Sequence, residues 1–467
     1  MADWMRARLI PVSGIDSARE AETRATSAFL AVMSVVRPLS KALLDRLGAS
    51  RAHNAAVDTF IEVEFDWNGR RVRPDGVIRV VHGSRPPWSA MVEVKTGDNE
   101  LSAEQINLYW DIARANGYDA VITISNQLAP RLGEHPTVGL KVRANSPVQV
   151  HHYSWTYVIS EALMQKRHRG VDDKEQAWIL GEFIRYLEHP SSGATSFDDM
   201  GPSWVPVRDS AREGTLTRRD AGAIDIASRW VQLMRYCSLR LSADIGEDVQ
   251  TLWSRRRDTD PAKRVSELAT LLAQSGRLDA GLRVPNTAGD IEIVADIKAK
   301  QLTASIEVDA PQDRGARSRV TWLATQLADA PTKTVVEAWP KNARAPVAST
   351  TLTDVREDRT LLCPDNKEAA RFRLILRGEM GPARKSGRKT LSFVDSTLRL
   401  LDEFYAGVVQ NLKPWQPPAP RMPSTAERAT DEASDTETAS AELLQELGAS
   451  VPTDTPTRAS EASDQQR

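Results

Sequence analysis

The chain has 467 residues, of which 41% are hydrophobic and 27% charged, a composition typical of a globular protein with more than one core. Its formal net charge is −2; residues 421–467 contribute −6, so the remainder carries only +4, which excludes a global basic field for binding nucleic acid. Cys237 and Cys363 match no disulfide or zinc-finger spacing, and no apolar run suits a signal peptide or a membrane span. We therefore expect a cytoplasmic protein that does not enter a membrane.

The first third of the chain alternates helical and strand-forming segments. Apolar residues at helical spacing predict a helix that Pro38 interrupts, and alternating residues predict two strands joined by a tight turn at Asn68-Gly69. Ser102 is expected to cap a later helix, with Gln105 at the capping-box position. In chain order, the expected elements are helices over 17–36 and 39–47, strands over 59–67, 71–81 and 89–95, a helix over 102–115, strands over 119–124 and 148–154, and a helix to about 165. This order predicts a central sheet flanked by helices.

The rest of the chain predicts a helical middle region, an α+β region and a tail. The expected elements are helices over 173–187, 220–241 and 262–274, a loop over 190–206, a strand hairpin over 291–299 and 302–308, and a helix over 320–327. After about residue 415, proline, serine, threonine and acidic residues predict a disordered acidic tail with at most a transient helix over 439–447. The predicted domains are 1–168, 169–280, 281–415 and 416–467.

Asp75, Glu93 and Lys95 form the constellation that carries chemistry. Asp75 lies in the string R-P-D-G and the other two lie in V-E-V-K, so they should converge near the ends of adjacent strands. Glu93 and Lys95 are two positions apart on a strand and therefore share a face. Two carboxylates can hold a hard cation such as Mg²⁺, with a backbone carbonyl near Val94 as a further ligand, and the ion activates water for hydrolysis of a phosphodiester. The lysine ammonium can position that water or stabilise the transition-state charge.

The P-D and E-V-K strings resemble the active-site signature of the PD-(D/E)xK nuclease superfamily, which includes restriction endonucleases, Holliday-junction resolvases and repair exonucleases. Gln105 and Tyr109, at Q-x-x-x-Y spacing on the following helix, resemble the accessory motif of its RecB-like branch, and i, i+4 spacing puts them on one helix face. The first helix has no histidine, which that branch often carries there. Glu22 is the candidate acidic residue of this helix because it shares a face with apolar residues, whereas Glu20 is expected to face solvent.

The resemblance covers residues 15–165 and implies a fold, a cofactor and a substrate. The implied fold is a restriction-endonuclease-like mixed α/β sheet flanked by helices. The implied cofactor is Mg²⁺ or Mn²⁺, bound by Asp75 and Glu93, and the implied substrate is DNA. The catalytic residues predicted in this way are Asp75, Glu93, Lys95, Gln105, Tyr109 and Glu22.

We therefore predict a metal-dependent nuclease, with genome defence, repair or a stress response as settings suggested by analogy alone. Two alternatives stay open. One is a catalytically inactive nuclease-like fold that binds nucleic acid or acts as a scaffold. The other is an interaction module that recruits a protein partner through the C-terminal domain or the tail.

Weaker signals elsewhere have two interpretations each. Asp290 or Asp296, followed by Glu307, is similar in order and spacing to Asp75 and Glu93. Because no lysine follows Glu307 two positions later, we favour an unrelated hairpin over a degenerate repeat of the nuclease fold. The adjacent histidines at 151–152 should face opposite sides of a strand, so a structural role is favoured over a shared metal. The basic runs at 255–257 and 384–389 suit a solvated face better than phosphate contacts.

Overall fold

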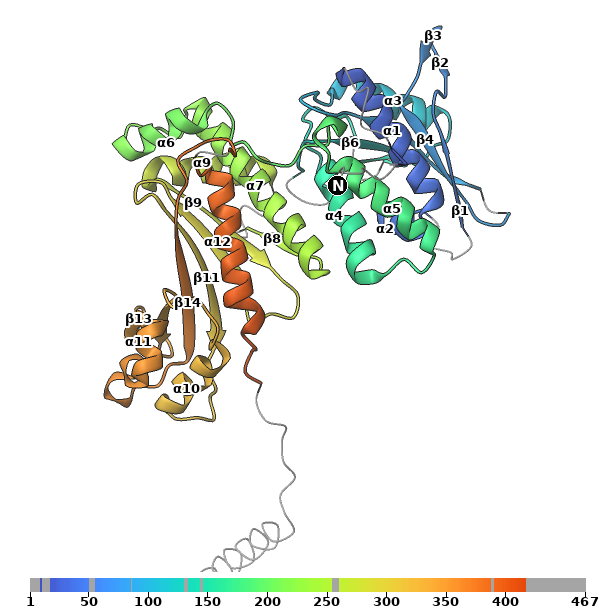
Figure 1. Cartoon of the computed structure of the whole chain (residues 1–467). Coiled ribbons are helices and arrows are strands. Elements are labelled where there is room, and N and C mark those ends of the chain that lie inside the picture. Colours follow the sequence, from blue (N-terminus) through green and yellow to red (C-terminus); the bar gives the residue numbers. More distant parts are fainter. Residues whose placement is uncertain are drawn as a thin grey trace, which may run out of the picture. The chain divides into compact units, whose positions relative to one another are not determined.

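Two large β-sheets organise the part of the chain that the computed structural model describes, which comprises residues 9–10, 17–49, 55–84, 86–129, 133–142, 146–253, 260–387 and 390–416 (Figure 1). The predicted tail beyond residue 416, its helix over 439–447 and the basic run 255–257 lie outside these residues. The predicted mixture of helices and strands is confirmed.

The first sheet has five strands in the order β1-β4-β5-β6-β7. The pairs β1–β4 and β4–β5 are antiparallel, and the pairs β5–β6 and β6–β7 are parallel, so the sheet is mixed. Its strands are β1 (Ala56–Phe60), β4 (Gly76–Val81), β5 (Trp88–Val94), β6 (Ala120–Ser125) and β7 (Gln149–Ser154).

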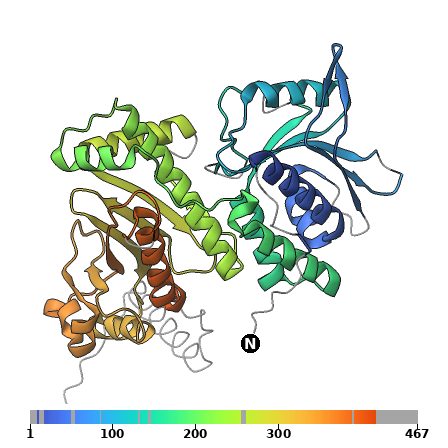
Figure 2. The same cartoon turned by 45° about the horizontal axis from the view of Figure 1, so that its top comes forward.

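Helices cover both faces of this sheet (Figures 1 and 2). Ala90, Val92 and Val94 of β5 pack into a core shared with α1, α2, α4 and α5, whereas Met91 packs on the opposite face with α3. Because successive side chains of a strand point to opposite faces, the side chains of β5 pack alternately into two apolar layers. The helices are α1 (Ala18–Val35), α2 (Arg37–Leu44), the 3₁₀-helix η1 (Asp45–Leu47), α3 (Ala103–Ala115), α4 (Trp155–Met164), the π-helix η2 (Gln165–Arg169) and α5 (Lys174–Leu187).

The predicted break near Pro38 is confirmed. Pro38 lies in the first turn of α2, where its missing N–H leaves no helical bond unmade. The helical segments Ala18–Val35 and Arg37–Leu47 meet at a bend of 102°. Among the described residues no single helix is long and apolar enough to cross a membrane, and these two pass that test only together, as a bent pair.

The strands predicted over 59–67 and 71–81 are each broken in two. Glu62 has a φ of 58°, which separates β1 from β2 (Phe65–Trp67), and Pro74, which has no N–H to donate, lies between β3 (Arg70–Val72) and β4. The predicted tight turn is confirmed, since Asn68 and Gly69 both have positive φ values, 54° and 75°, between paired β2 and β3. As a consequence Asp75 lies immediately before β4.

The second sheet has seven strands in the order β13-β12-β14-β11-β10-β9-β8, and each neighbouring pair is antiparallel. Helices α7, α9 and α12 supply much of the core on one face. The strands are β8 (Gln250–Leu252), β9 (Arg277–Arg283), β10 (Ile291–Asp296), β11 (Gln301–Asp309), β12 (Val335–Trp339), β13 (Ala348–Thr351) and β14 (Arg371–Glu379). The helices of this part are α6 (Trp204–Glu213), α7 (Ala221–Ile245), α9 (Pro261–Ser275), α10 (Ala316–Gln326), α11 (Leu352–Glu357), η4 (Arg359–Leu362), η5 (Pro364–Asn366), α12 (Phe393–Gly407) and η6 (Val409–Asn411), whereas the short η3 (Pro190–Ser192) packs against α1 and α5.

Only some of these later elements were predictable. The helices corresponding to α5, α7, α9 and α10 and the hairpin β10–β11 match the predictions, while β8, β9, β12, β13, β14, α6, α11 and α12 went unpredicted. Strand β9 (Arg277–Arg283) runs across residue 280, where the sequence predicts a domain boundary. In the second hairpin, Asp296 pairs with Arg277 at 2.8 Å within an all-antiparallel sheet, which favours an unrelated hairpin over a repeat of the first constellation.

Gly76 is required by the close approach of α1 to the strand that follows Asp75. In Gly76→Ala the new Cβ would meet Leu30 Cδ1 and lie 3.0 Å from the Phe60 carbonyl oxygen. We expect a loss of about 1–3 kcal/mol in the free energy of unfolding, measured by urea denaturation, because a packed core resists added volume. Gly387→Ala is the control, since nothing lies within 4 Å of its added Cβ. Equal stability of the two variants would contradict the prediction.

Candidate active site

The antiparallel pairing of β4 with β5 places Asp75 beside Glu93. Gly76 is opposite Val92, and the Val94 backbone N–H donates to Asp75 Oδ2 at 2.7 Å. This bond fixes the aspartate against the strand that carries the glutamate. The two carboxylates of the predicted constellation therefore meet at one end of the sheet.

Lys95 and Glu22 complete a charged cluster around Glu93. Lys95 follows the last residue of β5, and its Nζ lies 2.6 Å from Glu93 Oε1 and 3.2 Å from Glu22 Oε1. Lys95 Nζ also donates to the Val94 carbonyl at 3.1 Å. Glu22 thus reaches the cluster from α1, whereas Glu20 forms the capping box of that helix with Ser17.

Glu93 is the most deeply buried member of the cluster, with 1% exposure. Its Oε1 is bound to Lys95, but its buried Oε2 has no hydrogen-bond partner among the described residues. Burial, followed by repulsion from Asp75, raises the pKa of the Glu93 carboxyl to about 7 against the opposing effects of Lys95 and of the nearby Tyr109 hydroxyl. Burial alone would lower the pKa of Lys95, but Glu93, Asp75 and Glu22 outweigh it and raise that pKa.

Gln105 and Tyr109 form a hydrogen-bonded pair on one face of α3. Gln105 Nε2 donates to the Tyr109 hydroxyl at 3.0 Å, and that hydroxyl donates to the Arg73 carbonyl at 3.2 Å. Burial and the nearby Glu93 carboxylate raise the pKa of Tyr109. The pair therefore ties α3 to the segment that leads into Asp75. Ser102 caps α3 as predicted, but the Gln105 side chain bonds Tyr109 and does not complete a capping box.

Two further residues, which were not predicted, bond members of the cluster. Trp155 is fully buried, and its Nε1 donates to the Lys95 carbonyl at 2.9 Å. Asn99 Nδ2 donates to Glu22 Oε2 at 3.4 Å. Neither residue has a sequence signal, because Trp155 is distant along the chain and Asn99 looks like an ordinary loop residue.

A hydrogen-bonded chain of two histidines lies beside Glu93. Thr123 of β6 is the register partner of Glu93, and its Oγ1 lies 2.9 Å from His135 Nε2 and 3.0 Å from His152 Nδ1. The Thr137 backbone N–H donates to His135 Nδ1, so His135 Nε2–H donates to the threonine. His152 Nε2–H donates to the Gln127 carbonyl at 2.8 Å, so its Nδ1 is an acceptor. The Thr123 hydroxyl lies within hydrogen-bond distance of this nitrogen and of the His151 carbonyl, at 3.0 and 3.2 Å.

Both histidines are held neutral by this arrangement. Burial lowers the pKa of His135 to about 4, and burial together with His135 lowers the pKa of His152 to about 3. The His151 side chain bonds none of these groups, and its position in β7 puts it on the other face, as predicted. Every ring nitrogen of the pair has a partner, so the chain fixes the segment carrying His135 and offers no nitrogen to a metal.

The donor set at Asp75 and Glu93 suits a hard divalent cation. An unpartnered buried carboxylate oxygen next to a second carboxylate is stabilised by a bound positive charge, and Mg²⁺ commonly uses one or two carboxylates and several waters. No group of three or more His, Cys, Asp or Glu side chains arranged to hold a metal occurs in the described part of the chain. Asp75 and Glu93 are the side chains that could hold Mg²⁺ or Mn²⁺, while Glu22 is engaged by Lys95.

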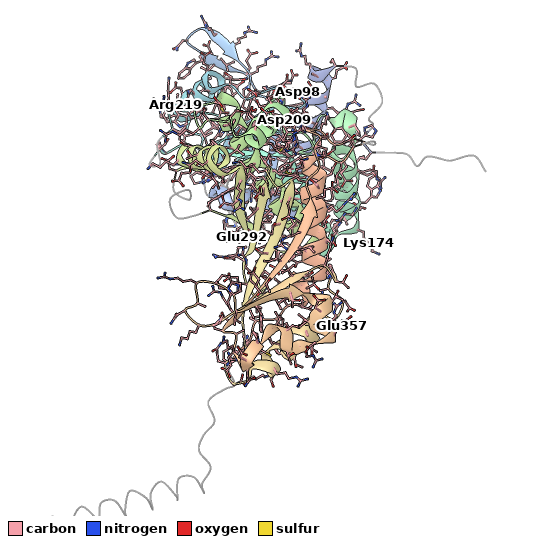
Figure 3. All side chains as sticks on the ribbon, turned by 90° about the vertical axis from the view of Figure 1, so that its left-hand side faces the viewer. Asp98, Lys174, Asp209, Arg219, Glu292 and Glu357 are labelled. Carbon is pink, nitrogen blue, oxygen red and sulfur yellow. The ribbon has the colours of Figure 1, made fainter. Side chains whose placement is uncertain are left out.

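A cleft of about 650 Å³ lies beyond the ends of β5 and β6. Asp98, labelled in Figure 3, belongs to the loop that follows β5 and lines this cleft. The charged residues of its lining are mostly acidic: Asp98, Glu100, Glu188, Asp198 and Asp199, with Arg229 and Lys385. A negative lining of this kind disfavours a phosphate backbone.

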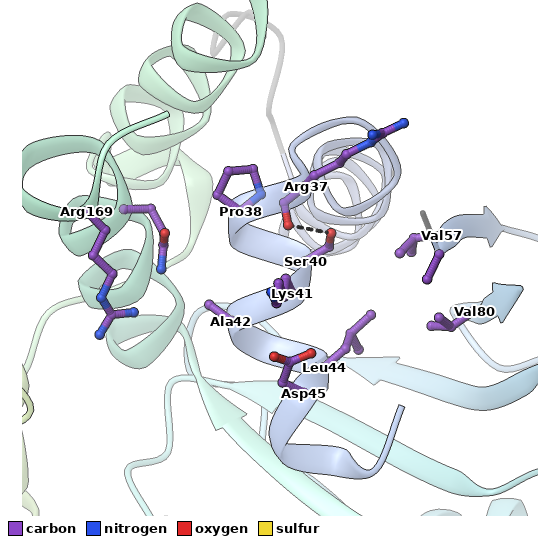
Figure 4. A pocket seen from close by; sticks show the side chains of 12 residues that line it. Arg37, Pro38, Ser40, Lys41, Ala42, Leu44, Asp45, Val57, Val80 and Arg169 are labelled. Carbon is purple, nitrogen blue, oxygen red and sulfur yellow. Dashed lines mark hydrogen bonds between the residues drawn. The ribbon is translucent and has the colours of Figure 1, made fainter. Parts of the chain in front are cut away.

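A second pocket, of about 410 Å³, lies between α2, η2 and the strands β1 and β4 (Figure 4). Arg37, Lys41 and Arg169 contribute its positive charge, and Arg169 is already paired with Glu161 at 2.6 Å. None of the six predicted site residues lines this pocket. The chemistry proposed below therefore does not involve it.

Comparison of the chain with protein families, with curated proteins and with solved structures found no match.

Because both histidines are neutral in the folded protein, we expect the free energy of unfolding to fall at acidic pH. Their pKa values are lower in the folded protein than the ordinary 6.5, so the unfolded chain binds more protons below that pH and stability falls as pH decreases towards 4. At one pH unit below 6.5 each histidine should cost ~1.4 kcal/mol of unfolding free energy. The measurement is urea denaturation of wild type and of His135→Gln/His152→Gln from neutral pH down to 5.

The difference between the two proteins isolates the histidines. Glu93 acts in the opposite sense, because a raised pKa costs stability as pH rises from 4.5 through 7, but this contribution is common to both proteins. The double variant should be less stable at neutral pH and lose less stability on acidification. Parallel pH profiles would refute the neutral-histidine assignment.

Proposed function

We propose that this chain is a metal-dependent nuclease of the PD-(D/E)xK type that hydrolyses phosphodiester bonds of DNA. The observation that carries the proposal is the state of Glu93: one carboxylate oxygen is bound to Lys95, and the other is buried without a partner next to Asp75. A carboxylate oxygen without a hydrogen-bond partner does not stabilise a structural ion pair. A cation site, in contrast, needs a carboxylate oxygen that is free to bind the metal.

The arrangement of the first sheet supports the proposal. Apart from α2 and the separate β2–β3 hairpin, the chain order is a helix (α1), three antiparallel strands (β1, β4 and β5), a second helix (α3) and a parallel strand (β6). Asp75 lies just before β4, and Glu93 and Lys95 lie at the end of β5. The same order characterises the resembled superfamily. DNA is proposed as substrate because that superfamily mostly cuts DNA; genome defence, repair or a stress response are settings by analogy only.

The chain's own residues have separate tasks in this proposal. Asp75 and Glu93 would hold Mg²⁺ or Mn²⁺, which supplies a water of lowered pKa and neutralises charge on the phosphate. Lys95, held between Glu93 and Glu22, would orient the attacking water or donate to a phosphate oxygen as negative charge develops there. Gln105 and Tyr109 would position the segment at Arg73, and Glu22 would position Lys95.

A second candidate is a catalytically inactive protein with the same fold, used for binding or as a scaffold. The observation that favours it is that Lys95 Nζ already has three acceptors, Glu93, Glu22 and the Val94 carbonyl. An ammonium with all three N–H groups engaged suits a closed structural network. A protein partner for the C-terminal region or the tail stays a prediction.

Cleavage of DNA separates these candidates. With Mg²⁺ or Mn²⁺, the wild type should degrade plasmid or linear duplex, and Asp75→Asn, Glu93→Gln and Lys95→Ala should each lose at least ~100-fold in rate, the order expected when one group that stabilises a charged transition state is removed. Asp98→Asn, an exposed carboxylate in the next loop, is the matched control and should retain wild-type activity. Absence of cleavage of DNA and RNA by the wild type would favour the inactive alternative.

Metal binding can be measured without activity. Mg²⁺ or Mn²⁺ should raise the melting temperature of the wild type at pH 8, because the ion stabilises the buried Glu93 carboxylate, and should raise it less at pH 6, where protonation of a carboxyl with a pKa of about 7 competes. Glu93→Gln should lose most of this shift. An equal shift in wild type and variant would show that the ions bind elsewhere.

A further inference from the structure

Residues 133–142, here named the rim loop, are anchored to three separate elements. Asn107 of α3 binds the loop twice, donating to the Gly139 carbonyl at 3.2 Å and accepting from the Lys141 N–H at 2.8 Å. Glu134 forms two bonds, at 3.1 and 3.2 Å, to Arg264, whose side chain is fully buried. With His135 bound to Thr123, the rim loop is held by α3, by β6 and by α9.

The rim loop lies next to the candidate active site. Thr123, which binds His135, is the register partner of Glu93 in the parallel pair β5–β6, so both side chains point to the face covered by α3. Gly139 packs against the first residue of α3, with Ala103 Cβ 3.8 Å from the position of an added glycine Cβ. Ala103 is two residues before Gln105.

The anchored loop presents two side chains to solvent. Val138 is 89% exposed, the highest exposure among the large hydrophobic side chains that the structure describes as exposed. Lys141 is exposed, and within the described part of the chain no carboxylate pairs with it. Ordinary surface packing does not explain why a loop with three buried polar anchors would present an apolar tip and an unpaired cation.

We propose that the rim loop contacts the nucleic acid beside the bond that is cut, with Lys141 on a backbone phosphate and Val138 against a base or sugar. This rests on the proposed nuclease function. The cleft beyond β5 and β6 is lined mostly by carboxylates, so it repels a phosphate backbone and leaves the rim loop as the favourable approach. The anchors keep the loop ordered before binding, which lowers the entropic cost of forming the contacts.

The test is binding of a short fluorescently labelled DNA duplex and of its single strand, without divalent metal, over about 50–200 mM salt. Lys141→Ala should lower the slope of log affinity against log salt by about 1, as expected for one lost phosphate contact. Val138→Ala should weaken binding ~3-fold with the slope unchanged, the order expected for lost methyl contacts. Both variants should fold, because Val138 is exposed and the anchor at Lys141 uses its backbone N–H.

Two matched variants control for general effects. Lys174→Ala, labelled in Figure 3 at the start of α5, and Val35→Ala, 45% exposed at the end of α1, should bind as the wild type does. If the wild type binds DNA and Lys141→Ala keeps its affinity and salt slope, the rim-loop proposal fails and the nuclease proposal stands. If the wild type neither binds nor cleaves nucleic acid, both fail together.

Discussion

The burial of the Glu93 carboxylate is the constraint on which the rest of the site depends. A charge with 1% exposure is costly unless a counter-charge and hydrogen bonds replace water, and Lys95 satisfies only one of the two oxygens. Asp75, held by the Val94 N–H, adds a repulsion that raises the pKa of Glu93. Evolution rarely retains such an arrangement for stability alone, because removing the charge would relieve it. The arrangement is physically reasonable where a cation completes it.

The fold explains how helices from both layers can reach this one carboxylate. Within β5 the side chains alternate between the layer of α1 and the layer of α3, so a residue in mid-strand would contact only one of them. Glu93 is the penultimate residue of β5 and Lys95 lies just past its end, where the ammonium can reach Glu22 of α1 while Tyr109 of α3 approaches Glu93. Side chains from the two layers therefore meet at this end of the strand.

Short-range interactions of this chain are predictable from its sequence, whereas interactions between distant residues are not. Local signals were sufficient for Ser102 as a cap and Asn68-Gly69 as a turn, since their partners lie within a few residues. Asp75 and Glu93 could be expected to approach each other because adjacent strands bring them together, and the structure does bring them together. The left-handed conformation of Glu62 breaks a strand that alternation predicts as continuous. The bonds of Glu134 to Arg264 join residues 130 positions apart, and no periodicity encodes them.

The net charge of this protein determines how strongly it attracts a polyanion such as DNA. Outside the acidic tail the chain carries only +4, so long-range attraction to DNA is weak and binding must depend on contacts formed at the site itself. Asp75 and Glu93 repel a phosphate when no cation is present, and the neighbouring cleft adds further carboxylates. In the proposed function a bound divalent ion would reverse the local sign, so catalysis would require the ion and affinity would increase with it. Under this proposal the rim loop, which supplies one lysine and one apolar side chain, would orient a substrate that the net charge of the protein does not attract.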